Sequence, residues 1–431
     1  MYYFIGIKGT GMASLAIMLH DIGHEVLGSD QEKHFFTEDE LVKRNIKILP
    51  FDENNIKEEY TVIIGNAFLE DFPEVIRARK LCKCYRYHEF LGELMKDYTT
   101  VSIAGSHGKT TTTTIAKTVL SEFKKTAYLI GDGEGFLQKD SEYLCVESDE
   151  FRRHFISYHP EYAIITNIEI DHVDYFKDEI DYFNSYQEFV NNVKKAIFYH
   201  GDDEWCRKLE FKVPAFSFGL SKTNDYYADN VVTNNNTTSF DLYHNDKFLY
   251  RYTLPLVGNH VLIDTLGVLS LADYLGFDYS RSQKALDSYS GPKRRYVIEE
   301  YKDTIFVDDY AHHPTEVKVT IEASKLRYPD RKIIAIFKPH RASRVQYFAT
   351  QFKEALELAD EIYLLDFTSI DDKQDGTDID ITYLGNMIPN SHILPENDEG
   401  AKILSKYKGE CLVFMSSKDI YNIANKVKEL I

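Results

Sequence analysis

The sequence predicts an α/β protein built from three domains. Strand-length apolar runs alternate with helical patterns, this alternation restarts after residue 98 and again near residue 293, and a glycine-rich loop opens the second series. At 431 residues the chain is also too long for one ordinary domain. We therefore expect domain 1 over residues 1–97, domain 2 over 98–293 and domain 3 over 294–431.

The first domain is expected to be Rossmann-like, with a parallel sheet and a ligand-binding turn. A strand over residues 2–6 leads into the turn 6–11, and further strands are predicted over 24–28 and 62–64. The turn has the glycine spacing G-x-x-G-x-G instead of the dinucleotide pattern G-x-G-x-x-G. It indicates a diphosphate-containing ligand without specifying NAD, and a purely structural turn is the alternative.

The second domain is expected to bind a nucleotide through residues 105–110, which read Gly-Ser-His-Gly-Lys-Thr. An apolar run precedes this loop and a helical pattern follows it, which is the order that a phosphate-binding loop requires. Backbone N–H groups would surround the phosphates, Lys109 would reach the β- and γ-phosphates, and Thr110 would ligate Mg²⁺. The loop is two residues shorter than the usual form. We predict a P-loop NTPase-like domain, to which residues 226–254 add antiparallel strands.

Acidic residues and a histidine follow two further strands of the second domain. Glu150 comes shortly after the apolar run 144–146, and His172 lies between Asp171 and Asp174 after the run 163–166. Ligands bind at the carboxyl ends of strands in such sheets, so these groups are candidates for holding two divalent ions. The alternatives are solvated carboxylates and a structural histidine.

The third domain, also Rossmann-like, has basic residues where strands end. Residues 293–295 (Lys-Arg-Arg) lie at the domain junction, and the segments 308–314 and 337–344 each follow or end a predicted strand. Arginines there can clamp a phosphate or a carboxylate, whereas isolated basic pairs are usually solvated.

Composition excludes several classes of protein. The formal charge of −19 argues against a nucleic-acid binder, and the five cysteines have no metal-ligand spacing. No apolar run has membrane-spanning length and no signal peptide precedes the first strand, so we expect a cytoplasmic protein without membrane partners. The sequence leaves open whether the chain forms a weak homo-oligomer.

Together, the shortened loop 105–110 and Thr-Asn-Ile-x-x-Asp-His at 166–172 resemble motifs of the Mur ligase family, the ATP-dependent amide-forming enzymes of peptidoglycan synthesis. The resemblance covers essentially the whole chain. Within the family, the segments 4–12, 308–314 and 339–344 are similar to those of members that join L-alanine to UDP-N-acetylmuramate.

The resemblance implies that the muramyl carboxylate attacks the γ-phosphate of ATP, and that the amine of L-alanine then displaces phosphate from the acyl phosphate. It implies a UDP-sugar site formed by Gly6, Lys8, Gly9, Thr10, Gly11, Met12, Ser29, Asp30 and Asn66. It implies an ATP site formed by Gly105, Ser106, His107, Gly108, Lys109, Thr110, Thr111, His260, Arg295 and Asp309. The catalytic residues would be Lys109, Glu150, His172, Arg295, His312, His340, Arg341 and Arg344, with Thr110, Glu150 and His172 on two Mg²⁺ ions.

The sequence departs from the family pattern in two places. Val261 replaces an asparagine that can contact adenine, and Ser416-Ser417-Lys418 replaces a Gly-Ala-Gly turn. The second change concerns the amino-acid pocket. Two alternative functions therefore stay open. The protein could be a sister ligase that takes a tripeptide or another amino acid, or a nucleotide-binding homologue without catalytic activity. A NAD-dependent oxidoreductase does not account for the loop 105–110.

Overall fold

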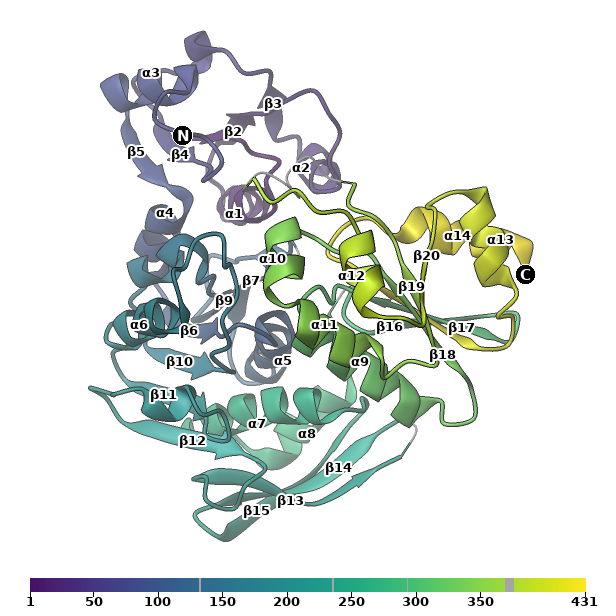
Figure 1. Cartoon of the computed structure of the whole chain (residues 1–431). Coiled ribbons are helices and arrows are strands. Elements are labelled where there is room, and N and C mark those ends of the chain that lie inside the picture. Colours follow the sequence, from purple (N-terminus) through teal and green to yellow (C-terminus); the bar gives the residue numbers. More distant parts are fainter. Residues whose placement is uncertain (132, 235, 293, 369–375) are drawn as a thin grey trace.

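Three β-sheets follow one another along the chain (Figure 1). The computed structural model describes residues 1–131, 133–234, 236–292, 294–368 and 376–431. Each sheet is covered by the helices of its own segment, and the N-terminal and C-terminal sheets lie on different sides of the central domain. The predicted three-domain α/β fold is confirmed; Lys293, predicted to lie at the second junction, is outside the described residues.

The N-terminal sheet has the strand order β3-β2-β1-β4-β5, and every pair is parallel. Its strands are β1 (Tyr2–Ile5), β2 (Val26–Ser29), β3 (Lys47–Leu49), β4 (Thr61–Ile64) and β5 (Lys83–Arg86). Its helices are α1 (Thr10–Asp21), α2 (Glu38–Lys43), α3 (Pro73–Leu81) and α4 (Tyr87–Met95). Because β1 lies between β2 and β4, the turn after β1 and the residues that end β2 lie at the same edge of the sheet.

The central sheet has ten strands in the order β15-β14-β13-β12-β11-β10-β6-β9-β7-β8. They are β6 (Thr99–Ala104), β7 (Thr126–Leu129), β8 (Gly135–Phe136), β9 (Tyr143–Glu147), β10 (Tyr162–Ile165), β11 (Ala196–His200), β12 (Ala215–Gly219), β13 (Tyr226–Thr233), β14 (Thr238–His244) and β15 (Lys247–Leu254). The helices are α5 (Lys109–Ser121), α6 (Glu179–Val190), α7 (Asn259–Tyr274) and α8 (Tyr279–Asp287). The pairs β13·β14 and β14·β15 are antiparallel, as predicted.

The C-terminal sheet has the order β16-β17-β21-β18-β19-β20, and only the edge pair β16·β17 is antiparallel among the described strands. The strands are β16 (Val297–Tyr301), β17 (Thr304–Asp309), β18 (Ile333–Phe337), β19 (Glu361–Leu364), β20 (Ser391–Ile393) and β21 (Cys411–Met415). The helices are α9 (Pro314–Arg327), α10 (Ala342–Tyr347), α11 (Ala349–Leu356), α12 (Thr382–Met387), α13 (Asp398–Ser405) and α14 (Tyr421–Leu430).

The middle strands of the sheets are apolar on both faces. Every residue of β10, β18 and β21 is buried, because helices cover the two faces of each parallel sheet. Such strands show no polar–apolar alternation, which is why their sequences read as continuous apolar runs. Each of these strands ends where its buried apolar run ends, so the polar residues that follow lie at the edge of the sheet.

Strand order brings the predicted site residues together. In the central sheet β6 lies between β9 and β10, so the loops that follow these three strands meet at one edge. In the C-terminal sheet β21 lies between β17 and β18, which gathers the segments after these strands in the same way. The helices α9 and α10 contact the central domain, because Thr315 of α9 bonds to Glu169 and Arg344 of α10 bonds to Asp171.

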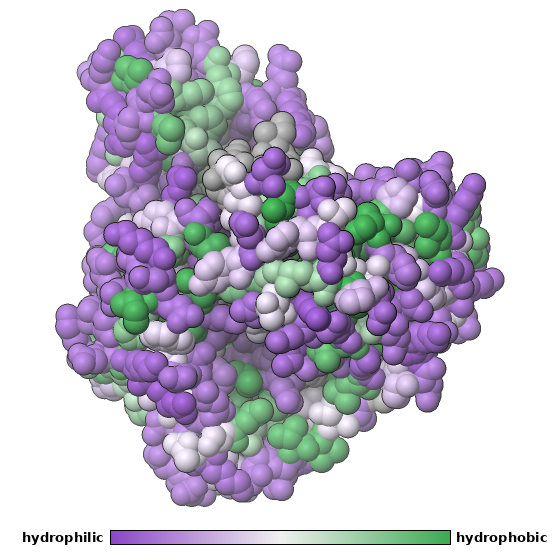
Figure 2. Space-filling model, in the orientation of Figure 1, coloured by the Kyte–Doolittle hydropathy of each residue, from purple (hydrophilic) through white to green (hydrophobic). Residues whose placement is uncertain are grey.

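Within the described residues, we find no helix with the length and apolar character needed to cross a lipid bilayer. On the face shown in Figure 2, hydrophilic residues dominate and hydrophobic residues occur in small groups between them. The same face is hollowed below its centre, where the central and C-terminal domains meet.

Candidate active site

The phosphate loop connects β6 to α5 through two glycines with positive φ. Gly105 has φ +148° and Gly108 has φ +78°, a backbone region that side chains with a Cβ rarely adopt. A Cβ at Gly105 would lie 1.9 Å from Oγ1 of Thr166, and one at Gly108 would lie 2.5 Å from Oδ1 of Asp264. Both glycines are therefore required for the loop to pack against β10 and α7.

Gly105→Ala is expected to weaken ATP binding by at least tenfold. The added methyl group collides with Thr166 and displaces the loop that we predict to surround the phosphates. Titration of the protein with MgATP in a calorimeter checks this. The control is Gly276→Ala, because Gly276 also has a positive φ (+71°) but has open space around it. Equal ATP affinities for the two variants would contradict the prediction.

Lys109 is the first residue of α5 and folds back over the phosphate loop. Its Nζ donates to the carbonyls of Gly105 and Ser106 and lies 2.8 Å from Oε2 of Glu150. Burial alone lowers the pKa of Lys109, but the nearby carboxylates, Glu150 first among them, outweigh it and raise the pKa above its ordinary value. The ammonium group is therefore held charged at the mouth of the loop.

A carboxylate–histidine cluster lies beside this lysine. Asp149, Glu150 and His172 each offer one ligand atom, and these atoms lie within 4.8 Å of one another. The Nδ1 atom of His172 is buried and has no hydrogen-bond partner among the described residues. On the other side of the loop, Oγ1 of Thr110 donates to Oε1 of Glu147 over 3.1 Å. Carboxylates, an imidazole and a hydroxyl in this arrangement fit divalent ions.

The acidic run 147–150 predicts a magnesium site, and within it only Glu150, together with His172, is predicted as a ligand, whereas Asp149 and Glu147 are not. Glu147 is the last residue of β9 and Asp149 follows the strand, so both belong to the same acidic run as Glu150. Nothing in the run distinguished which of its carboxylates point toward the phosphate loop. The difference arises from backbone direction, which residue types alone do not specify.

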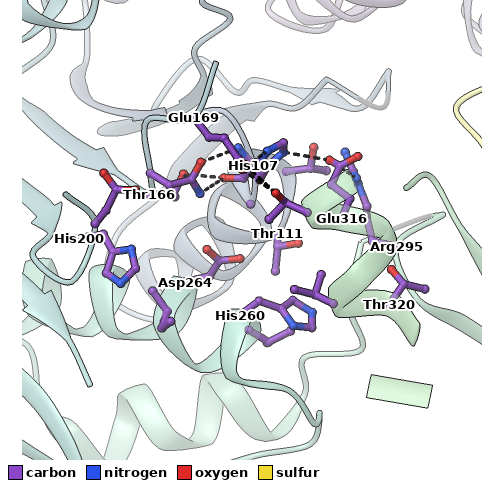
Figure 3. Close-up of a pocket in the computed structure, with 18 of the residues that line it drawn as sticks. His107, Thr111, Thr166, Glu169, His200, His260, Asp264, Arg295, Glu316 and Thr320 are labelled. Carbon is purple, nitrogen blue, oxygen red and sulfur yellow. Dashed lines mark hydrogen bonds and ion pairs between the residues drawn. The ribbon is translucent and has the colours of Figure 1, made fainter. Parts of the chain in front are cut away.

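A cavity of about 670 Å³ opens from the phosphate loop toward α7 and α9 (Figure 3). His107, Thr110 and Thr111 line one part, and His260 and Val261 from the start of α7 line another. Burial lowers the pKa of His260 to about 4, so its imidazole is neutral. Leu256, Val257, Ile263 and Trp205 add an apolar wall. Val261 thus extends an apolar surface at the place where the family pattern has an amide.

Arg295 and Asp309 reach the same cavity from domain 3. The NH1 group of Arg295 lies 3.3 Å from Oε1 of Glu316. The two carboxylate oxygens of Asp309 accept N–H groups from Tyr296 at 2.8 Å and Ala311 at 2.7 Å. A carboxylate oxygen has a second lone pair, so these bonds leave Asp309 able to accept from a ligand hydroxyl.

Asp309 makes stability depend on pH. Burial is the largest cause that raises its pKa to about 7, opposed by Arg295. Because this value lies above the ordinary 3.8, the contribution of Asp309 to stability is complete below pH 3.8 and is lost as the pH rises to about 7. Asp309→Asn removes this trend. From about pH 5 to about pH 7.5, the unfolding free energy of the variant should gain roughly 2 to 3 kcal/mol relative to the parent.

Urea unfolding monitored by tryptophan and tyrosine fluorescence at several pH values checks the expected change. The variant has lost one acceptor for a backbone N–H group, so its absolute stability is lower at acid pH and only the trend is diagnostic. The same pH trend in both proteins would contradict the assigned environment of Asp309.

Ion pairs hold domain 3 against domain 2. Nε and NH2 of Arg344 donate to Oδ1 of Asp171 at 3.0 and 2.8 Å, and the two side chains are only 4% and 7% exposed. Arg341 pairs with Asp174 next to it. Both arginines, predicted at the substrate end of the site, are therefore engaged by carboxylates of the central domain in this arrangement.

His107 lies between the two domains within the phosphate loop (Figure 3). Its Nε2 is 3.0 Å from Oε2 of Glu169, and its Nδ1 is 3.4 Å from Oε1 of Glu316 in α9. Burial lowers the pKa of His107, but the two carboxylates outweigh it and raise the pKa to about 10. Thr315 donates to both oxygens of Glu169, and His313 packs on His107 with ring centroids 4.5 Å apart. Neither a motif nor a spacing in the sequence predicts these contacts.

The remaining predicted residues of domain 3 lie close by. Nδ1 of His312 is 2.9 Å from Oε2 of Glu316, and Nδ1 of His340 is 3.0 Å from Oγ of Ser417. Ser416 is buried, its N–H donates to the carbonyl of Asp309, and its Oγ accepts the N–H of Lys418. The segment that replaces the Gly-Ala-Gly turn is therefore an ordered turn beside His340.

In domain 1, several predicted ligand residues are used within the domain. Nζ of Lys8 is 2.8 Å from Glu38 and also donates to backbone carbonyls, while the N–H of Lys8 donates to Oδ2 of Asp30. Ser29 is fully buried and donates to Glu74, a buried acid that the sequence analysis did not single out. The turn is also bonded within itself, because the N–H of Gly6 donates to the carbonyl of Ser29 and that of Gly9 donates to the carbonyl of Gly6. Of the predicted turn residues, Gly6 and Met12 are buried, Thr10 and Gly11 are partly exposed and Gly9 is exposed.

A second cavity of about 790 Å³ lies where the three domains meet. Asn66 and Tyr87 line it from domain 1, Asp149 and His154 from domain 2, and Arg341 from domain 3. Nδ2 of Asn66 lies 3.2 Å from Nε2 of His154. Asp149 belongs to both this cavity and the carboxylate–histidine cluster, which therefore lies at the cavity wall.

Comparisons with known proteins identify the family. Family models match in sequence order: "Mur ligase family, catalytic domain" over residues 1–99, "Mur ligase middle domain" over 103–272 and "Mur ligase, glutamate ligase domain" over 293–418. A UDP-N-acetylmuramate–L-alanine ligase of Lacticaseibacillus casei is 44% identical over 422 residues, which are 97% of this chain and 96% of the relative.

Solved structures show the same fold. The UDP-N-acetylmuramate-alanine ligase MurC of Thermotoga maritima aligns with a TM-score of 0.82 at 24% identity, over 100% of this chain and 98% of that one. A murein peptide ligase Mpl of Psychrobacter arcticus aligns with a TM-score of 0.71 at 22% identity, over 99% and 97%. The family models and the 44% identity across almost the whole chain establish that this protein belongs to the Mur ligase family.

Proposed function

We propose that this protein is an ATP-dependent ligase that joins L-alanine to the carboxylate of UDP-N-acetylmuramate for peptidoglycan synthesis. One observation carries the proposal: the phosphate loop lines one cavity, and Asp149 of the neighbouring carboxylate–histidine cluster lines the other. A nucleotide in the cavity beside Thr110 and a sugar nucleotide in the cavity beside Asn66 would therefore meet at Glu150 and His172. The full-length similarity to a ligase with this name supports the same substrates.

In the first step a carboxylate oxygen of the sugar nucleotide attacks the γ-phosphorus of ATP, and ADP leaves. Lys109 and the N–H groups of the loop would stabilise the negative charge on the transferred phosphoryl group. Thr110 and Glu150 would hold one Mg²⁺ ion, and His172 with Asp149 would hold a second. When bound, such ions would offset the negative charge of the phosphates during the transfer. Arg295 and Asp309 would bind the phosphates and the ribose.

In the second step the amine of L-alanine attacks the acyl carbon, and phosphate leaves. His312, His340 and the turn at 416–418 would form the amino-acid end of the site, because they lie beside one another on domain 3. The pairs of Arg344 with Asp171 and Arg341 with Asp174 would keep domain 3 closed over the acyl phosphate. Closure excludes the water that would hydrolyse this intermediate.

In domain 1 the sugar nucleotide would lie against the backbone of the turn at Gly6–Met12, with Asp30 and Asn66 beside it. Lys8 and Ser29 would act by shaping this turn, since their side chains bond to Glu38 and Glu74. This proposal keeps the predicted residues but divides them into direct contacts and supporting ones.

Phosphate release from ATP tests the function. Release should require Mg²⁺, UDP-N-acetylmuramate and an amino acid together, with L-alanine the best, and mass spectrometry should show the alanyl product. Equal release with a tripeptide would identify a sister ligase instead. ATP binding without release under any combination would identify a nucleotide-binding homologue without ligase activity.

A further inference from the structure

The turn that follows β21 carries three side chains where the family pattern has Gly-Ala-Gly. They are Ser416, Ser417 and Lys418, and none of the three is among the described non-glycine residues with a positive φ. The backbone conformation of this turn therefore does not require glycine. Ser417 adds a hydroxyl group at the place where the pattern has the methyl group of an alanine.

Two cations hold this turn in place through its backbone carbonyls. The NH2 group of Arg294 donates to the carbonyls of Ser416 and Lys418, both at 3.1 Å. The Nζ group of Lys338, a residue that is only 4% exposed, donates to the carbonyl of Asp419 at 2.8 Å. Because the carbonyls on either side of position 417 are fixed, the direction in which its side chain leaves the backbone is fixed as well.

The hydroxyl group of Ser417 contacts the imidazole of His340. Its Oγ lies 3.0 Å from Nδ1 of that ring. The ring of His312 is nearby, with its centroid 6.5 Å from the centroid of the His340 ring. These three residues follow β21, β18 and β17, which are neighbouring strands of the C-terminal sheet. The contact therefore belongs to the region that we assign to the amino-acid end of the site.

A hydrogen bond at one nitrogen of an imidazole determines what the other nitrogen can do. It fixes the plane of the ring, and it selects which nitrogen carries the proton of the neutral form. An alanine at position 417 has no atom that can form this bond. The Nε2 atom of His340 would then lose one of the contacts that fix its direction and its protonation.

We propose that Ser417 is a positioning residue, which orients the imidazole of His340 toward the amino acid that attacks the acyl phosphate. The inference rests on the proposed ligase function and deepens it, because it links amino-acid binding to a side chain that the family pattern lacks. Ser417 acts through His340, so its loss should affect the amino-acid substrate and largely spare ATP and the sugar nucleotide.

Steady-state kinetics separate this role from a merely structural one. Ser417→Ala should raise the KM for L-alanine about three- to tenfold, which corresponds to one lost hydrogen bond, and Ser417→Thr should largely preserve it. The KM values for ATP and UDP-N-acetylmuramate should stay close to those of the parent. In a His340→Ala background, Ser417→Ala should have no further effect, because its partner is missing. Ser405→Ala is the control, since Ser405 bonds to Lys402 within α13.

Nuclear magnetic resonance of the protein with isotopically labelled histidine tests the contact without turnover. The Nδ1 signal of His340, identified by its absence in His340→Ala, should shift in Ser417→Ala and keep its position in Ser417→Thr. An unchanged signal or an unchanged KM for L-alanine in Ser417→Ala would overturn the proposal, as would an equal further loss in the His340→Ala background. Thermal melting confirms that each variant is folded. A protein without ligase activity would contradict the proposed function, whereas the histidine signals would still show whether Ser417 holds His340.

Discussion

Lys109→Met is expected to reduce ATP-dependent phosphate release by roughly two to three orders of magnitude. The methionine keeps the length and the packing of the side chain but removes the ammonium charge of Lys109, which lies at the mouth of the phosphate loop. Backbone N–H groups of the loop remain, so MgATP affinity should fall much less than turnover. Rapid measurement of phosphate release at saturating ATP, UDP-N-acetylmuramate and L-alanine gives the rate.

The Lys109 variant also removes the partner of Glu150, which is nearly inaccessible to solvent. Breaking a buried pair costs about 3 to 5 kcal/mol, so the melting temperature must be recorded beside the rate. Lys117→Met is the matched control, because Lys117 is on the same helix but pairs with Glu134 away from the phosphate loop. Binding of the sugar nucleotide should survive in both variants. A Lys109 variant that retains more than a tenth of parent activity would refute the assigned role.

Asp171→Asn is expected to open the contact between domains 2 and 3. It leaves the Arg344 guanidinium buried opposite a neutral amide, which costs about 3 to 5 kcal/mol in the closed arrangement. When domain 3 moves away, water reaches Arg344 and the cost disappears. The free energy should therefore appear as a shift from closed to open protein more than as unfolding. Ligase turnover should fall with it, because closure protects the acyl phosphate.

Small-angle X-ray scattering checks the expected opening through the radius of gyration. The matched control is Asp181→Asn, since the Asp181–Arg153 pair lies within domain 2 and is more than a quarter exposed on each side. Removing that pair should cost about 1 kcal/mol or less and leave the scattering curve unchanged. An unchanged radius of gyration in Asp171→Asn, with normal turnover, would show that Arg344 does not hold the domains together.

Local signals in the sequence were sufficient for the fold and for the centre of the site. Buried parallel strands produce continuous apolar runs, and the polar residues after them must lie at one edge of the sheet, so Glu150 and His172 could be placed near Lys109. The antiparallel strands at 226–254 were predicted from alternating polar and apolar residues. In each case a few neighbouring residues carried the information.

The contacts between domains could not be predicted in this way. The partner of Arg344 is 173 positions away, and Thr315 meets Glu169 across 146 positions. No periodicity or motif records how two rigid units are oriented. The same holds within domain 1, where Lys8 was expected to face a ligand but pairs with Glu38, because the position of α2 decides its direction.

His107 connects the phosphate loop of domain 2 to domain 3. It belongs to the segment that surrounds the phosphates, yet Glu316 on α9 contacts it from another domain. A nucleotide that orders the loop is therefore expected to favour the docked orientation of domain 3. Because such coupling is reciprocal, a change that tilts domain 3 should alter the affinity for nucleotide by the same coupling free energy. Substitutions on α9 that do not touch ATP are thus expected to change the affinity for ATP. The His107 imidazole therefore links the phosphate loop to the orientation of domain 3.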